Sequence, residues 1–419
     1  MTAFAYRGGE FYCEEVPIAK IVQEVGTPCY LYSHRMLADG YGALDQAFAG
    51  LPHLICYAMK ANSSLAILRI FIDAGGGLDI VSGGELFLAL RAGADPQRIV
   101  FAGVGKSAEE IEAALKADIL LFNVESAQEL EALQTAAAQL GKRARVAVRV
   151  NPDVDPKTHP YISTGLRQSK FGVPIREAMA LYRNMRRLHH IEPVGVHAHI
   201  GSQITQVAPF RESLSKLVPL VQALRQDGFD IQYLDIGGGL GIRYKDEGPP
   251  AASDYAKTLR PLLGGLDCTL LMEPGRLLVG NAGILVTKVL YVKANQDKKF
   301  VVVDGGMNDL IRPSLYDAYH AIVPVVQRAN GQPETTLDVV GPICESGDFL
   351  AKDRALPTCQ PGDLLAVLSA GAYGFAMASN YNARPRVPEV MVNGEQFAVV
   401  RARETYEDLI RGEIIPTWS

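Results

Sequence analysis

Eight short apolar runs, separated by amphipathic stretches, are the feature that most constrains the fold of this chain. They are Leu54–Tyr57, Leu78–Val81, Ile99–Ala102, Ile119–Phe122, Val146–Val150, Val194–His199, Tyr233–Ile236 and Thr269–Met272. Short runs rich in Val, Ile and Leu are typical of buried parallel strands. Eight strand–helix repeats in about 225 residues predict a closed (β/α)8 barrel, an α/β fold. An open doubly wound sheet is the alternative, and the count of eight favours the barrel.

Two segments between these runs match a capping box, in which a serine and a later glutamate satisfy each other's backbone amides. They are Ser107–Glu110 and Ser126–Glu129. After the second, apolar residues recur at helical spacing, at Leu130, Leu133, Ala137 and Leu140. Residues Gly105–Ser107 resemble the tail of a P-loop, but Val100 stands where that motif requires glycine. We therefore interpret them as a helix cap.

The strand pattern changes after Asn281. Ile284–Val292, Phe300–Val303 and Leu364–Leu368 are strand-like without regular helices between them, and Val390–Phe397 is a hairpin with Asn-Gly at its turn. Ala5–Tyr12 is a weaker hairpin signal. We predict a barrel domain over residues 36–280. Residues 1–35 and 281–419 are expected to form one β-rich domain, sandwich-like or barrel-like, which the N-terminal segment completes.

Composition and charge exclude several classes of protein. The formal charge of −5 offers no basic surface for nucleic acid. Continuous apolar stretches are too short to cross a bilayer, and no signal peptide is visible at the start. The cysteines, at positions 13, 29, 56, 268, 344 and 359, are scattered without a CxxC pair. Neither a metal centre nor a disulfide framework is therefore predicted, and a reducing cytoplasm is the expected location.

Lys60 is the first candidate functional residue, because chemistry in such barrels lies at the carboxyl ends of the strands. It follows the first apolar run, in the string Cys56–Asn62. Partial desolvation at the rim of a core lowers the pKa of an amine. A neutral amine can form a Schiff base with pyridoxal 5'-phosphate (PLP). On this string alone, a solvated lysine that closes the strand is the alternative.

Other strand ends also carry polar or glycine residues. The triplet Gly237, Gly238 and Gly239 is either a simple turn or a cradle of amides for a phosphate. His197 and His199 share a strand face by their spacing, which is compatible with a metal pair or with one core histidine. Glu273 would be costly to bury alone, and a protonated pyridine nitrogen would be a suitable partner.

Six strings in order along the chain give it a family resemblance. They are Tyr57–Asn62, Gly195–Gln203, Glu273–Arg276, Arg312–Tyr316, Gly341–Asp348 and Ala370–Gly374. With these strings the chain resembles, nearly end to end, the PLP decarboxylases of the alanine-racemase fold (fold type III). Among them it is most similar to the diaminopimelate decarboxylases of bacterial lysine biosynthesis.

The resemblance implies a role for each matching residue of the barrel. Lys60 would carry PLP, Asp79 would contact it, His199 would stack on its ring, and Glu273 would keep its ring nitrogen protonated. The phosphate would be surrounded by Ser202, by Gly237, Gly238 and Gly239, and by Glu273, Pro274, Gly275 and Arg276.

The resemblance also implies roles outside the barrel. Arg276, Arg312 and Tyr316 would hold the distal end of the substrate, and Tyr373 would contact both cofactor and substrate. In a head-to-tail homodimer, Cys344 and Glu345 would reach the partner's site. There Cys344 would be the proton donor and Glu345 would contact the substrate amine.

The residue types agree with decarboxylation of a substrate that bears charges of both signs. An anionic Glu273 deepens the electron sink of PLP, whereas racemases of this fold carry arginine there. Arg276, Arg312 and Glu345 would match the distal carboxylate and amine of diaminopimelate.

Three alternatives stay open. One is a sister decarboxylase for arginine, ornithine or a carboxylated polyamine. Another is an enzyme for a modified or carrier-bound amino acid. The last is a non-catalytic paralogue that binds a protein partner, although such proteins have typically lost the lysine or the cysteine that are both present here.

Overall fold

The computed structural model describes residues 3–156, 158, 164–165, 170–295, 298–327 and 333–418. Contacts between residues divide the chain into two compact units. One comprises residues 38–243 and 247–278, and the other comprises residues 1–37, 244–246 and 279–419. We call the first the barrel unit and the second the β-rich unit.

The strands of the barrel unit form a closed parallel sheet. In chain order they are β5 (His53–Ala58), β6 (Gly77–Ile80), β7 (Ile99–Phe101), β8 (Leu121–Val124), β9 (Ala144–Asn151), β11 (Ile191–His197), β12 (Tyr233–Asp235) and β13 (Thr269–Met272). Each pairs in parallel with the next, and β13 pairs with β5. The short β10 (Val173–Pro174) adds to β9. The predicted (β/α)8 barrel is confirmed, because an open sheet would leave β5 and β13 unpaired with each other.

Seven of the eight strands differ by one to three residues from the predicted bounds, and Thr269–Met272 alone matches them. Two of these differences concern residues of the candidate site. β8 runs from Leu121 to Val124 rather than from Ile119 to Phe122. β11 ends at His197, so His199 lies in the loop beyond the strand. Beyond this strand the carbonyl of Ile200 accepts the amide of Gly165, at 3.0 Å.

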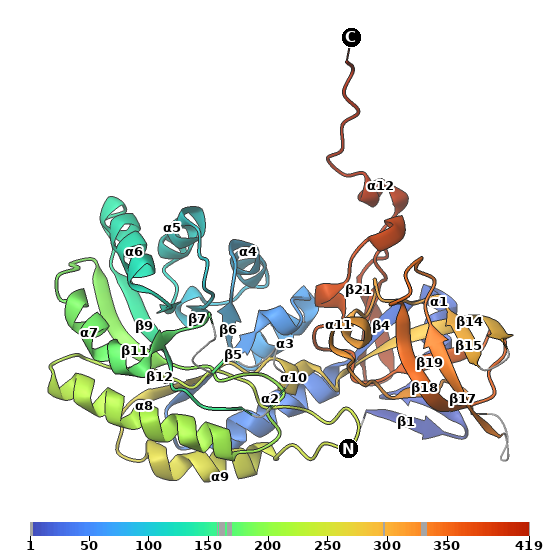
Figure 1. Ribbon diagram of the computed structural model, residues 1–419, viewed down its shortest axis with the longest axis horizontal. Helices are drawn as coiled ribbons and strands as arrows, with labels where there is room; N and C mark the ends of the chain where they lie inside the picture. Colours follow the sequence, from blue (N-terminus) through green and yellow to red (C-terminus); the bar gives the residue numbers. More distant parts are fainter. Residues whose placement is uncertain are drawn as a thin grey trace. The chain divides into compact units, whose positions relative to one another are not determined.

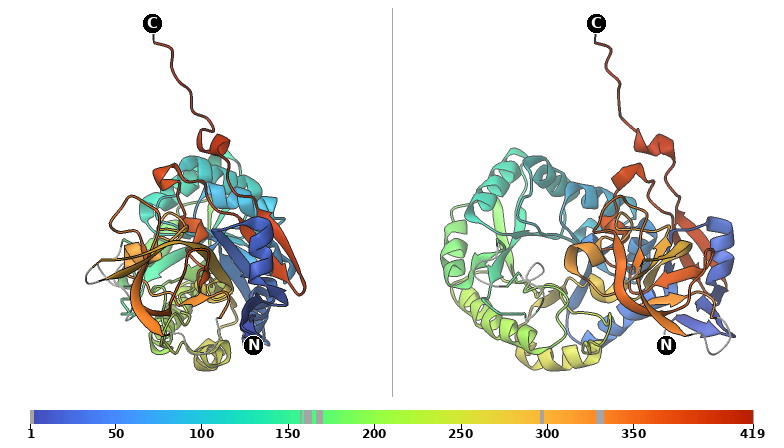
Figure 2. Two further views of the ribbon diagram at one scale, coloured as in Figure 1. Left: turned by 90° about the vertical axis from the view of Figure 1, so that its right-hand side faces the viewer. Right: turned by 45° about the vertical axis from the view of Figure 1, so that its right-hand side comes forward.

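Helices alternate with the barrel strands and form a ring outside them (Figure 2). They are α2 (His34–Phe48), α3 (Leu65–Asp73), α4 (Gly83–Arg91), α5 (Ala108–Ala117), α6 (Ala127–Gln139), α7 (Ile175–Met185), α8 (Ala208–Gln226), α9 (Ala252–Leu263) and α10 (Arg276–Val279). Consecutive members from α3 to α6 and from α7 to α9 contact one another. None of the described helices has both the length and the apolar composition that crossing a bilayer requires.

Only one of the two predicted capping boxes is complete. Ser107 and Glu110 satisfy each other's amides at the start of α5. At the start of α6 the hydroxyl of Ser126 accepts the Glu129 amide at 3.1 Å. The Glu129 carboxylate, however, is bound to the Lys106 amine at 2.6 Å and to the Glu125 amide at 2.8 Å. The prediction of a second box was therefore wrong, because a buried lysine competes for the carboxylate.

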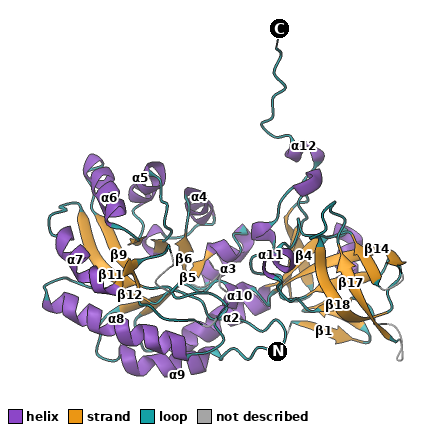
Figure 3. Cartoon of the chain, in the orientation of Figure 1, coloured by secondary structure: helices purple, strands orange, loops and turns teal. Residues whose placement is uncertain are grey.

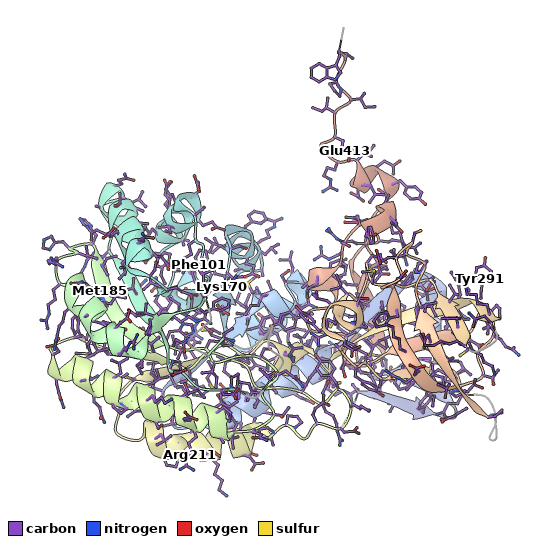
Figure 4. All side chains as sticks on the ribbon, viewed as in Figure 1. Phe101, Lys170, Met185, Arg211, Tyr291 and Glu413 are labelled. Atoms are coloured by element: carbon purple, nitrogen blue, oxygen red, sulfur yellow. The ribbon has the colours of Figure 1, made fainter. Side chains whose placement is uncertain are left out.

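The inside of the barrel is packed with side chains from several strands. One buried cluster consists of Cys56, Val100, Leu120, Leu121, Ala147, Val194 and Leu271. Phe101, labelled in Figure 4, is fully buried as well, but strand alternation places it on the outer face of the sheet, opposite Val100, where its ring lies 6.1 Å from that of Phe122. The barrel is thus a filled core, and chemistry is confined to its ends.

The β-rich unit is built on β14 (Gly283–Ala294), which pairs antiparallel with three strands (Figure 3). The largest sheet has the order β18-β17-β15-β14-β4-β20-β21. Its other members are β4 (Cys29–Ser33), β15 (Lys299–Val303), β17 (Glu334–Val340), β18 (Phe349–Pro357), β20 (Glu389–Asn393) and β21 (Gln396–Arg401). β19 (Leu364–Val367) joins β14 to β16 (Ile322–Pro324).

The N-terminal segment completes the β-rich unit, as predicted. β4 lies between β14 and β20. A second sheet contains β1 (Phe4–Arg7), β2 (Glu10–Cys13) and β3 (Val16–Pro17), followed by α1 (Ile18–Val25). Buried residues from both ends of the chain, such as Ile18, Leu31 and Val390, share one core.

Both predicted hairpins are present. The turn of the β20–β21 hairpin contains Gly394 at φ 60°, and the turn of the β1–β2 hairpin contains Gly8 at φ 57° and Gly9 at φ 87°. These positive values explain why glycine occupies the turns. After the short α12 (Tyr406–Leu409) the chain continues as an extended segment (Figure 1).

Candidate active site at the barrel end

Lys60 lies where the first barrel strand ends, in the short 3₁₀ turn Met59–Ala61. Its Nζ is 2.7 Å from Oδ2 of Asp79, which belongs to β6. The Asp79 side chain is fully buried, whereas that of Lys60 is 34% exposed. The expectation of a merely desolvated amine therefore needs correction, because an adjacent carboxylate favours the ammonium form.

Asp79 is tuned to exchange a proton near neutrality. Burial, together with the negative charge of Glu273, raises the pKa of Asp79 to about 7 despite the opposing charge of Lys60. A carboxylate with such a pKa is well matched as a proton acceptor at physiological pH. It can take a proton from Nζ of Lys60 and leave a neutral, nucleophilic amine.

His199 lies beyond the end of β11, and its Nδ1 accepts the Gly238 amide at 3.1 Å. The pKa of His199 lies well below its usual value, first because of desolvation and then because of the charges of Arg149 and Lys60. The ring is therefore neutral, and its proton sits on Nε2 because Nδ1 is an acceptor. A neutral, half-buried ring is suited to stacking on a flat cofactor.

The glycine triplet is a place of close approach between loops. A Cβ on Gly238 would lie 2.0 Å from the Glu273 carbonyl oxygen, and one on Gly239 would lie 2.2 Å from the Gly201 carbonyl oxygen. The amide of Gly237 donates to Asp235 at 2.9 Å, and that of Gly238 donates to His199. Two of the three amides thus donate to other side chains, and the phosphate cradle stays a prediction.

Arg276 and Ser202 lie together at the same end of the barrel. Nη2 of Arg276 donates to Oγ of Ser202 at 3.1 Å, and Arg276 is 5% exposed. Arg276 begins α10, directly after Glu273, Pro274 and Gly275. A buried guanidinium beside a hydroxyl is suited to binding phosphate or carboxylate oxygens.

Glu273 is buried, at 3% exposed, but it is not alone. Its Oε2 lies 3.4 Å from Nε2 of His197, and its Oε1 accepts from Nδ2 of Asn123 at 3.0 Å. The same Asn123 nitrogen donates to Asp235 at 3.1 Å. Ligand-type atoms of His197, Asp235 and Glu273 lie within 4.8 Å of one another. His199 is not part of this group, so of the two interpretations left open by the sequence, a core histidine describes His197, which is fully buried.

Asn123 and Asp235 were not singled out as site residues by the sequence. Asn123 follows Leu121 and Phe122 in a fully buried strand, where an amide side chain needs a partner. Asp235 follows the apolar Leu234 in the same way. A polar residue inside a buried parallel strand is the signal that would have identified both.

Arg312 and Tyr316 lie in the β-rich unit, in α11 (Arg312–Tyr316). The Arg312 guanidinium is 5.1 Å from the ring centre of Tyr244 and 5.7 Å from that of Tyr316. Its Nε is 3.4 Å from Nε2 of His320. Arg312 is only 7% exposed, so aromatic rings and an imidazole fix the direction of its charge.

Cys344 and Glu345 are exposed at the tip of a tight loop in the β-rich unit. The carboxylate of Asp348 holds this loop by accepting the amides of Met307, at 2.7 Å, and Ile343, at 2.6 Å. The Cys344 amide donates to Asn382 at 2.8 Å. The loop thus presents a thiol and a carboxylate from a constrained backbone.

Tyr373 also lies in the β-rich unit and has a strained backbone, with φ 56°. Its neighbours leave little freedom, since a Cβ on Gly371 would lie 1.9 Å from the Val279 carbonyl oxygen. A left-handed conformation at a tyrosine costs energy and is found most often at functional sites. Tyr373 is half-buried, so part of its ring is accessible.

The donor set at the barrel end fits PLP. Lys60 offers a primary amine with a proton acceptor beside it, and Glu273 offers a buried carboxylate for a protonated ring nitrogen. Arg276 and Ser202 offer groups for a phosphate. The structure brings these predicted residues together with Asp79 and His199, whereas Arg312, Tyr316, Cys344, Glu345 and Tyr373 belong to the other unit.

Known proteins resemble the chain over nearly its whole length. Residues 37–280 match the family described as pyridoxal-dependent decarboxylase, pyridoxal binding domain. Diaminopimelate decarboxylase of Pseudomonas aeruginosa is 52% identical over 99% of this chain and 99% of its own. That of Aquifex aeolicus is also 52% identical, over 97% of this chain and 96% of its own. The crystal structure of diaminopimelate decarboxylase from Helicobacter pylori, complexed with L-lysine, has a TM-score of 0.91. It is 46% identical and covers 94% of this chain and 98% of its own.

We expect Asp79→Asn to slow the attachment of PLP to Lys60 in the apoenzyme, because an amide cannot accept the ammonium proton. A general base of this kind is worth about 10²-fold or more. The wild-type rate should rise as Asp79 ionises, around pH 7, and the rise should move to higher pH in the variant. Absorbance records the rate, and borohydride reduction with peptide mapping identifies the labelled lysine.

Asp73→Asn is the matched control, because Asp73 is an exposed carboxylate paired with Arg69 in the same unit. Attachment at the wild-type rate in Asp79→Asn, or a label on a lysine other than Lys60, would contradict the role.

Proposed function

Because the chain belongs to the diaminopimelate decarboxylases, within the pyridoxal-dependent decarboxylases, we propose that it converts meso-2,6-diaminopimelate to L-lysine and CO2 in lysine biosynthesis. The observation that carries this proposal is the 52% identity over 99% of both chains to a diaminopimelate decarboxylase. Residues 36–280 are proposed as the PLP-binding domain.

PLP, when bound, supplies the electron sink that accepts the charge left at the substrate's α-carbon when CO2 departs. Lys60 is its proposed attachment point. Asp79 can accept a proton from the Lys60 amine. This supports Lys60 as the attachment point, because a nucleophilic amine must be neutral.

Glu273 and His199 are proposed to hold the ring of the cofactor. The pKa of Glu273 is raised by burial, but the neighbouring His197 and Lys60 reverse this effect and lower it overall. A carboxylate that stays ionised can keep a nearby ring nitrogen protonated. His199, neutral and oriented by the Gly238 amide, is proposed to cover one face of the ring.

The remaining residues are proposed to bind the phosphate and the substrate. Arg276 and Ser202, with Gly239, are suited to the phosphate. Arg312 and Tyr316 are suited to the distal carboxylate, because the rings around Arg312 orient a desolvated guanidinium. Tyr373 is proposed to contact both cofactor and substrate.

We further propose a homodimer whose active sites are shared between subunits. The exposed thiol of Cys344 and the exposed carboxylate of Glu345, on a loop held by Asp348, are suited to serving a partner's site. Cys344 would return a proton to the α-carbon and Glu345 would bind the distal amine. The free thiols of all six cysteines agree with a cytoplasmic location.

The alternative functions differ from the proposed one in which of these residues they require. Ornithine and arginine carry no distal carboxylate, so a sister decarboxylase for them would have no use for a buried arginine such as Arg312 at that end. A non-catalytic paralogue would not need the ionised Glu273 and the Lys60–Asp79 pair. A decarboxylase for a modified or carrier-bound amino acid stays an alternative, because it would retain the residues described for the barrel end.

We expect the purified enzyme to release CO2 from meso-diaminopimelate far faster than from L-lysine, L-ornithine or L-arginine. A site that pairs buried arginines with a carboxylate rejects analogues that lack it by about 10⁴-fold. Measuring kcat/KM for the four substrates tests this. Faster turnover of ornithine or arginine would favour the sister-decarboxylase reading instead.

Arg312→Ala should raise KM for diaminopimelate sharply without changing the absorbance of bound PLP. The reason is that Arg312 is proposed to contact the substrate but not the cofactor. Arg312→Lys should recover only part of the loss, since an ammonium cannot bind a carboxylate bidentately. Arg411→Ala, at an exposed arginine of the same unit, is the control. An unchanged KM in Arg312→Ala would contradict the assignment.

Mixing inactive Lys60→Ala with inactive Cys344→Ala should restore activity if each site combines residues of two subunits. A heterodimer then contains one intact site and one doubly damaged site, so it reaches up to about half of the native activity. Mass spectrometry confirms that subunits have exchanged. Exchange without any recovered activity would disprove the shared site.

A further inference from the structure

Two carboxyl groups, Asp235 and Glu273, lie together at the barrel end away from solvent. Asp235 is 0% exposed and Glu273 is 3% exposed. One amide nitrogen, Nδ2 of Asn123, donates to both, at 3.1 Å and 3.0 Å. Side-chain oxygens of Asp235 and Glu273 lie within 4.8 Å of each other. Two buried carboxylates this close cannot both ionise without a large repulsion. One of them therefore holds a proton.

The surroundings decide which of the two keeps the charge. Glu273 has the ring of His197 at 3.4 Å from its Oε2, and this ring is fully buried. Asp235 receives a backbone amide, that of Gly237, at 2.9 Å. A positively charged or N–H-bearing ring stabilises an adjacent anion more than it stabilises a neutral acid. The geometry thus places the charge on Glu273 and the proton on Asp235.

The pKa shifts of Asp235, Glu273 and their neighbours agree with a proton on Asp235 and a charge on Glu273. Burial and the charge of Glu273 raise the pKa of Asp235 well above its usual value, whereas the pKa of Glu273 is lowered overall. The thiol of Cys56, which also faces this layer, is neutral because burial raises its pKa strongly. The other titratable groups that act on the pair are Lys60, Asp79, His197 and His199.

We propose that Asn123, His197 and Asp235 are positioning residues that hold Glu273 as the only anion of the carboxyl pair and fix the direction of its carboxylate. The proposal rests on the proposed function, in which Glu273 faces the ring nitrogen of PLP. Asp235 carries the proton of the pair, Asn123 donates to both carboxyl groups, and the His197 ring lies beside the ionised carboxylate of Glu273. Without this layer Glu273 would take up a proton and could no longer support a protonated ring.

The proton on Asp235 can be tested without the cofactor. Burial also raises the pKa values of Asp79 and Asp309, to about 7 and about 6, and those of Glu85, Asp348 and Glu389. The test at pH 9 therefore uses the difference between the wild-type and Asp235→Asn spectra, in which these groups cancel. The infrared spectrum of the apoenzyme should still contain the carbonyl band of a protonated carboxylic acid, and Asp235→Asn should remove it. A wild-type spectrum without the band, or a band that is equally strong in Asp235→Asn, would overturn the proposal.

The effect on the ring is tested in the holoenzyme with ¹⁵N-labelled PLP. His197→Leu should shift the ring-nitrogen resonance toward the unprotonated form and lower kcat about 10²-fold, with little change in KM. His197→Gln retains an N–H donor and should recover most of both. Asp235→Asn resembles a protonated carboxyl group and should keep the wild-type resonance.

His53→Gln is the matched control, because His53 begins β5 at the opposite end of that strand from Lys60. A protonated ring and wild-type kcat in His197→Leu would overturn the proposal. So would a stoichiometric metal ion that is lost in Asp235→Asn, because Asp235 would then be ionised. If His197→Leu does not fold, the infrared result decides, and that result is independent of whether the enzyme decarboxylates diaminopimelate.

Discussion

Pairing of the last barrel strand with the first is the constraint on which the site depends. The register of β13 on β5 aligns Met272 with Ile55, and the amide of Ala58, at the end of β5, donates to the carbonyl of Pro274, just past β13, at 3.0 Å. This pairing brings the loop that carries Glu273 beside the turn that carries Lys60, although the two are far apart in sequence. All the remaining strands run parallel to these two, so their carboxyl ends lie at the same end of the barrel. The side chains of Asp79, Asn123, His197 and Asp235 are thereby brought close to Lys60 and Glu273.

Such a gathering of charges in a filled barrel is stable only because hydrogen bonds distribute the protons. Lys60 donates to Asp79 and Asn123 donates to Glu273, while the His197 ring lies 3.4 Å from the Glu273 carboxylate. Desolvation alone would neutralise each carboxyl group. The protein opposes it selectively, so that one carboxyl group stays ionised, one stays neutral, and one titrates close to pH 7. These different states of similar residues are what acid–base chemistry at a single cofactor requires.

The sequence predicted the barrel, the hairpins and the site residues at strand ends because those features depend on local patterns. Periodic apolar runs, an Asn-Gly turn and short motifs can be recognised without knowing what lies across the sheet. It did not predict that the Gly237 and Gly238 amides would be used by Asp235 and His199, because loop-to-loop contacts leave no periodic signal. Asn123 escaped notice for a similar reason, since its partners lie on other strands. The incomplete capping box at Ser126 shows how a distant side chain, Lys106, overrides a local pattern.

The position of β4 has a consequence for the order in which the chain is made. This strand, residues 29–33, lies between β14 and β20, and β20 begins only at Glu389. During synthesis the first residues leave the ribosome long before their partners exist, whereas all eight barrel strands are available once Met272 has emerged. The barrel can therefore fold while β4 still lacks its partner strands. The β-rich unit can complete its sheet only when the chain is nearly complete. An aborted or stalled chain would thus contain a barrel that already carries Lys60 but an unfinished β-rich unit whose strand edges are open to other chains.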